Sequence, residues 1–104
     1  MSIRYRITPR AAEDLNAIGR YTGKTWGKTL RDRYLRAMNR CFAKQAENPQ
    51  MGRPRPDIKD GFYSYPQGSH VIFYQIHDEG IDILGVLHQR MDVMPYFTNP
   101  DLPD

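Results

Sequence analysis

The chain has only one cysteine and no long hydrophobic run. The single cysteine, Cys41, excludes an internal disulfide framework. No stretch approaches the roughly 20 apolar residues that a membrane-spanning helix requires. The first residues, MSIRYRITPR, alternate apolar and charged side chains, unlike the apolar stretch of a signal peptide. We therefore expect a cytoplasmic protein without a membrane anchor.

Basic residues are scarce in the second half of the chain. Residues 1–59 hold 14 of the 15 Lys and Arg residues and five acids, a balance of +9. Residues 60–104 hold only Arg90 and seven acids, a balance of −6. This split predicts a basic side on the folded molecule. A basic side attracts nucleic acid and acidic protein segments alike, so charge alone leaves both classes of partner open.

A chain of 104 residues with 39% hydrophobic and 26% charged residues is long enough for one globular domain. We assign residues 1–97 to that domain and residues 98–104 to a C-terminal tail. The polar, proline-rich sequence after Pro95 predicts a frayed end.

The first half of the chain has the pattern of a strand followed by two helices. Ile3, Tyr5 and Ile7 alternate with arginines, as in a half-buried strand. Thr8 and Pro9 suit the start of a helix over residues 9–25, with a break at Gly27. A second amphipathic helix runs to Asn48-Pro49, where proline disfavours helix in the residue before it. Together they predict an antiparallel helical hairpin, whose outer face is basic.

Three antiparallel strands follow a proline-rich loop over residues 49–61. We expect strands at 62–65, 71–76 and 81–87, with a hairpin turn at 78–80. The order of elements predicts an α+β fold, in which the helical hairpin packs on one face of a small, mainly antiparallel sheet. The strand at 71–76 is apolar on both faces, so loops, the tail or another molecule must cover the second face.

Several segments resemble the ParE toxins of the RelE/ParE toxin–antitoxin superfamily. They are the helical run AAEDLNAIGRYTGKTWG, the Asn48-Pro49 stop, Gly52-Arg53, and SHVIFYQI followed by ILGVLHQRMD. The resemblance covers residues 3 to 97. It implies a toxin that a ParD-like antitoxin neutralises and that binds and inhibits DNA gyrase, without chemistry or a cofactor of its own.

The RelE branch of the same superfamily suggests an alternative, a ribosome-dependent messenger RNA endonuclease. Such chemistry needs a base, a proton donor and cations near the phosphate. The candidates are His70, His77, His88, Tyr63, Tyr74, Arg53, Arg55 and Lys59. The sheet half offers only one cation, Arg90, which favours the binding inhibitor. A toxin that has lost its activity is a third possibility.

The end of the last strand supplies candidate contacts with the target. Arg90 is the only arginine of an acidic half, and Asp92 points the same way if the strand continues. We include His88, which could orient Arg90 and Asp92. We also include Met91, Tyr96 and Phe97, because methionine and aromatic residues are common at protein interfaces. His88 can equally be a structural histidine, and the apolar group can be the edge of the core.

Contacts with the antitoxin are expected on the basic helices and on the sheet. The candidates are Arg31, Arg36, Arg40, Arg53, Tyr65, His70 and Tyr74. Each of these residues also has an explanation that involves no partner. The arginines can lie on a solvated helix face, and His70 can make a structural hydrogen bond. We expect Trp26 to seal the hairpin against the sheet. The histidines and Cys41 lack the spacing of a metal site, so no metal is expected.

Overall fold

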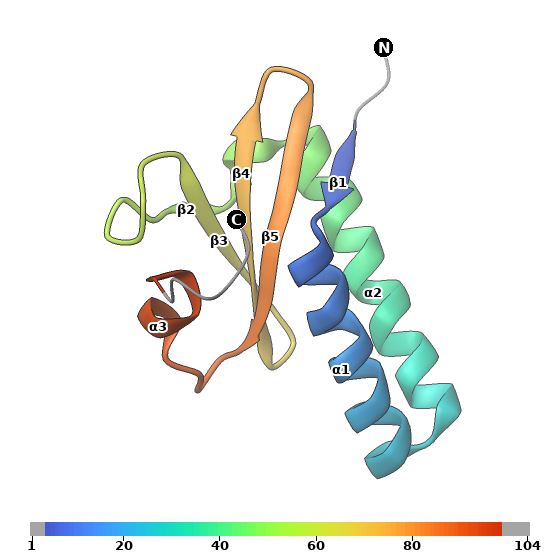
Figure 1. Ribbon diagram of the computed structural model, residues 1–104. Helices are drawn as coiled ribbons and strands as arrows, with labels where there is room; N and C mark the ends of the chain where they lie inside the picture. Colours follow the sequence, from blue (N-terminus) through green and yellow to red (C-terminus); the bar gives the residue numbers. More distant parts are fainter. Residues whose placement is uncertain (1–3, 99–104) are drawn as a thin grey trace.

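A five-stranded sheet forms the centre of the molecule (Figure 1), a computed structural model that describes residues 4–98. Its strands are β1 (Tyr5–Ile7), β2 (Arg53–Pro54), β3 (Phe62–Gln67), β4 (His70–His77) and β5 (Gly80–His88). They lie in the order β1-β5-β4-β3-β2. β1 runs parallel to β5 and all other neighbours are antiparallel, which confirms the mainly antiparallel sheet. The expected strand residue Ile3 lies outside the described residues.

The two long helices begin and end where the sequence predicts. Thr8 caps α1 (Pro9–Trp26), because its hydroxyl accepts a hydrogen bond of 3.3 Å from the Ala11 amide. Gly27, with φ of 94°, separates α1 from α2 (Lys28–Glu47). The Asn48-Pro49 stop is followed by a 3-10 turn, η1 (Pro49–Met51), and then by β2, two short elements within the predicted loop.

The hydrophobic core lies between the helical hairpin and one face of the sheet. Ile72 and Tyr74 of β4 are fully buried against this face, together with Met38 and Phe42 of α2. Cys41 is buried in the same cluster, as a small apolar side chain. This packing confirms the α+β class with a helical hairpin on one face.

The second face of the sheet is covered by the chain itself. Phe73 points away from the hairpin, because side chains alternate along a strand, and it is fully buried. The covering element is a short helix, α3 (Val93–Thr98), which Figure 1 shows on the side of the sheet opposite α2. The Phe97 ring lies 5.2 Å from that of Phe73 and 5.5 Å from that of Phe62, between centroids. Of the tail expected to fray, residues 98–104, only Thr98 is described, and it ends α3. Residues 99–104 lie outside the described residues.

Contacts with α1 hold α3 in place. The Tyr96 hydroxyl donates a hydrogen bond to Asp14, and Arg10 stacks over the Tyr96 ring, 3.3 Å from its centroid. Asp14 also accepts the Val86 amide of β5 at 3.0 Å, beyond the point where β1 ends. Gly85 leaves room for the Tyr96 ring, since a Cβ atom there would lie 2.8 Å from it. Thus α1, β5 and α3 share one polar junction at the edge of the sheet.

Among the described residues, no helix is both long and apolar enough to cross a bilayer.

Candidate functional site

An apolar groove of about 590 Å³ lies between the tip of the helical hairpin and the ends of β4 and β5. We call it the hairpin groove. Its most exposed apolar members are Tyr21 and Trp26 of α1, Leu30 of α2 and Met91, which follows β5. Trp26 and Tyr21 are 65% and 68% exposed, although large aromatic side chains are usually buried. An exposed apolar surface of this kind is typical of a protein interface.

His70 lies at the floor of the hairpin groove and is anchored to α2. Its Nδ1 atom lies 2.7 Å from the Tyr34 hydroxyl, which also accepts the Ser69 amide. Gly68, with φ of 60°, permits this approach, because a Cβ atom there would lie 2.7 Å from the Tyr34 oxygen. The predicted structural hydrogen bond of His70 is present. Burial lowers the pKa of His70, and the neighbouring His88 lowers it further.

The end of β5 brings His88 beside His70, with ring centroids 5.5 Å apart. β5 ends at His88, and the Arg90 amide then turns back to donate a hydrogen bond of 3.2 Å to the His88 Nδ1 atom. The strand therefore does not continue, so the shared orientation expected for Arg90 and Asp92 does not follow. Both residues are exposed, and no ion pair joins them within the part of the chain that the structure describes.

The candidate target contacts divide into two groups. His88 and Met91 line the hairpin groove, and Arg90 lies between them in the chain. Tyr96 and Phe97 instead turn inward on α3 and pack against the sheet. Their rings stabilise the covered face in this structure and are not free for a partner.

The candidate antitoxin contacts also lie in different parts of the structure and do not form one surface cluster. Arg40 and Tyr65 border one small cleft of about 230 Å³ between α2 and β3, and Arg36 and Arg53 are exposed. Arg31 pairs with Asp32 at 3.0 Å.

Tyr74 is the candidate that the fold removes from the surface. It is fully buried, its hydroxyl donates a hydrogen bond of 2.6 Å to the Pro49 carbonyl, and burial raises its pKa. Its role is therefore structural in the free chain, since no partner can reach its side chain here.

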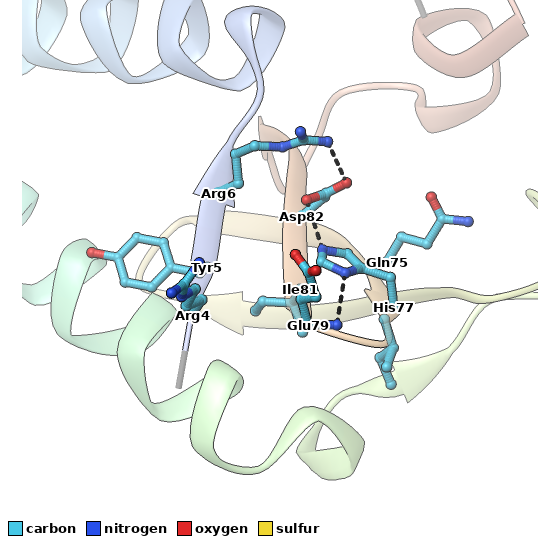
Figure 2. A pocket seen from close by; sticks show the side chains of 9 residues that line it. Arg4, Tyr5, Arg6, Gln75, His77, Glu79, Ile81 and Asp82 are labelled. Carbon is cyan, nitrogen blue, oxygen red and sulfur yellow. Dashed lines mark hydrogen bonds and ion pairs between the residues drawn. The ribbon is translucent and has the colours of Figure 1, made fainter. Parts of the chain in front are cut away.

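A second hollow, of about 600 Å³, lies at the opposite end of the sheet and is polar (Figure 2). There Asp82 accepts Arg6 at 2.9 Å and the His77 Nε2 atom at 3.1 Å, while the Glu79 amide donates to the His77 Nδ1 atom. His77 thus lies at the far end of β4 from His70. Arg55, another candidate for RNA chemistry, pairs with Asp57 at 2.9 Å. The three histidine candidates therefore do not share one site, because His77 lies at one end of β4 and His70 lies beside His88 at the other.

The sequence interpretation missed the hairpin groove because it misplaced Trp26. We expect Trp26 to seal the hairpin against the sheet, and this is wrong. Figure 1 shows the turn between α1 and α2 lying beyond the end of the sheet, and Trp26, one residue before this turn, is 65% exposed. Tyr21 and Leu30, near the same turn, are also exposed. The available signal was three large apolar residues close to Gly27, the turn of the hairpin.

Comparison with known proteins identifies the relatives of this chain. Residues 5–93 match the family described as ParE toxin of type II toxin-antitoxin system, parDE. Toxin ParE1 of Mycobacterium tuberculosis is 40% identical over 94 residues, which cover 89% of this chain and 96% of the relative. Toxin ParE1 of Caulobacter vibrioides is 35% identical over 88 residues, which cover 85% and 91%.

The fold is also similar to a solved structure described as the chromosomal ParDE TA system from P. aeruginosa. The TM-score is 0.70 at 17% sequence identity, and the match covers 83% of this chain and 95% of that one. At this identity the likeness concerns the fold alone, and it agrees with the strand order and the hairpin described above.

Proposed function

The chain belongs to the ParE toxin family, as the toxin of a ParDE type II toxin–antitoxin system, and we propose that it binds and inhibits DNA gyrase in the cytoplasm. Its partner in this system is an antitoxin. We further propose that a ParD-like antitoxin silences the toxin by laying an apolar segment in the hairpin groove. The observation that carries this second part is the exposure of Tyr21, Trp26 and Met91 around one cavity.

The surroundings of the groove indicate the chemistry of that segment. Lys24 and Lys28 are exposed on either side of Trp26 in the sequence, at the tip of the hairpin. An amphipathic helix with apolar residues on one face and acidic residues at its flanks would complement both the groove and these cations. The covered second face of the sheet offers no comparable apolar surface at Phe73.

We propose that the toxin acts by binding and not by catalysis. The scattered positions of His70, His77 and Arg55 support this proposal. Ribonuclease chemistry would require a base and several cations around one phosphate.

Gyrase inhibition is tested with purified toxin in supercoiling reactions, with cleaved gyrase–DNA complexes counted at the same time. We expect supercoiling to fall and cleaved complexes to accumulate at micromolar toxin. Unchanged gyrase activity, together with new messenger RNA ends after induction of the toxin, would support the ribonuclease alternative. Normal growth on induction, with neither effect, would support a toxin that has lost its activity.

The antitoxin site is tested with two matched methionine variants. Met91 and Met94 are both exposed, but only Met91 lines the hairpin groove. We expect Met91→Ser to weaken antitoxin binding about tenfold, since it removes apolar surface that the complex buries. Met94→Ser should bind like the wild type in the same calorimetric titration. Equal effects of the two substitutions would place the antitoxin elsewhere.

A further inference from the structure

The outer side of α2 carries a row of four exposed cations, which we call the basic stripe. It consists of Arg33, Arg36, Arg40 and Lys44. Their spacing of three, four and four residues places them on one side of the helix, each next to the following one. No Asp or Glu lies between Asp32 and Glu47, so the stripe is purely cationic.

No member of the stripe forms an ion pair within the described part of the molecule, and Asp32, the acid that precedes the stripe on α2, pairs with Arg31. The ion pairs formed there involve Arg6, Arg31, Arg55 and His77, and none includes a member of the stripe. Like charges three and four residues apart repel one another and disfavour the helix. A polyanion from outside the chain would relieve this repulsion.

Among residues 4–98, the stripe has few apolar anchors of the kind that protein interfaces use, since Met51 and Tyr65, in the cleft beside Arg40 and Lys44, are only partly exposed. The large exposed apolar side chains lie at the hairpin tip, after β5 and at Tyr5 of β1, which is 36% exposed, and none lies on α2 after Leu30. Protein partners derive much of their binding energy from buried aromatic and apolar anchors. A nucleic-acid backbone is bound through its charge and needs none. This difference favours a phosphodiester backbone over an acidic peptide.

We propose that the basic stripe binds the phosphate backbone of double-stranded DNA. The stripe extends about 16 Å along the helix axis, which corresponds to about five base-pair steps of one strand. Arg and Lys contacts of this kind position a protein on DNA without reading its sequence. The site is separate from the hairpin groove, and the proposal does not require gyrase to be the target.

The test measures binding of purified full-length toxin to a short fluorescent DNA duplex by anisotropy, over a series of salt concentrations. Four phosphate contacts predict a slope of log K against log salt of about −3.6. The variant R33Q/R36Q/R40Q/K44Q should lose at least tenfold in affinity at low salt, with a slope near zero. The milder variant R36Q/R40Q should keep about half of the slope.

A matched control separates the pattern of charge from its amount. R20Q/K24Q/K28Q/K59Q removes the same number of exposed cations outside the stripe and should retain the wild-type slope. Circular dichroism checks that each variant is folded. A labelled polyglutamate peptide, titrated in parallel, tests the competing class of partner.

Three outcomes would overturn the proposal. Wild-type toxin could fail to bind the duplex at low salt. The control variant could lose as much affinity as the stripe variant, which would reduce the effect to net charge. The stripe variant could retain DNA binding and lose polyglutamate binding, which would assign the stripe to an acidic protein segment. None of these measurements contains gyrase, so they are independent of the gyrase test.

Discussion

His70 lines the hairpin groove and is a titratable side chain whose pKa differs from its ordinary value. It contacts Tyr34 of α2, Ser69 before β4 and His88 of β5, and burial is the main reason why its pKa is low. A histidine whose folded-state pKa lies below its unfolded value favours the neutral form in the native protein. The unfolded chain therefore takes up a proton at a higher pH than the folded chain does.

Stability should fall as the pH drops below the ordinary histidine pKa of about 6.5. In that window the unfolded state binds more protons at position 70, which favours unfolding. We expect His70→Asn, whose amide can still meet Tyr34, to reduce this dependence on pH. Urea unfolding of both proteins across the window measures it, and an unchanged slope in the variant would assign the effect to other groups.

Substitution of Arg90 tests whether this exposed side chain beside the groove contacts a partner. Its side chain forms no ion pair within residues 4–98, so Arg90→Ala should change the free energy of unfolding by no more than about 0.5 kcal/mol. We expect a clear loss of toxicity or of antitoxin binding, measured by growth after induction and by titration. Equal loss of stability and function would show a structural role.

At the scale of elements, α3 is the feature that the sequence interpretation did not foresee. A helix of six residues is not stable by itself, so its local sequence carries little signal. It forms because Phe97 packs against Phe73 and Tyr96 packs against Gly85 on the sheet. These contacts join segments that are distant in the sequence. The long helices and the paired strands follow from local patterns and were predicted within a few residues.

Phe97→Ala should therefore destabilise the protein. The ring is partly buried against three other aromatic rings, and its removal is expected to lower the free energy of unfolding by about 2 kcal/mol. Chemical denaturation measures this change. Unaltered stability combined with lost target binding would return Phe97 to the interface, as the sequence interpretation has it.

The α2 helix contains a polar side chain that its environment does not satisfy. Gln45 is fully buried, and neither of its side-chain polar atoms has a hydrogen-bond partner among residues 4–98. Gln45→Met keeps a similar shape and removes the unsatisfied groups, so we expect a gain of about 1 kcal/mol in stability. Gln50→Met, at an exposed position, is the control and should leave the denaturation midpoint nearly unchanged. A loss of stability in Gln45→Met would mean that the amide has a role in the core.

At the scale of the whole molecule, the fold determines which predicted site residues meet. His70, His88 and Met91 come together because β4 and β5 are adjacent and antiparallel, and sequence could indicate that much. The exposure of Trp26 depends on how far the hairpin extends past the sheet. That relation involves lengths and angles of packed elements, which a sequence pattern does not specify.

The uneven charge of the chain should affect the rate at which an acidic partner arrives. Residues 1–59 carry a balance of +9, and their helices form one side of the molecule. We expect the association rate with the antitoxin to fall steeply as salt increases, while the dissociation rate changes little. Stopped-flow mixing measures both rates. An association rate independent of salt would show that charge does not steer the encounter.

Trp26 is the only tryptophan of the chain, and its indole ring stands in water at the mouth of the groove. The protein therefore carries its own optical reporter at the place where we expect a partner. Its ultraviolet emission should shift to shorter wavelength when a ligand excludes solvent from the ring. Occupancy of the groove can then be followed without a label, even in a screen of peptides.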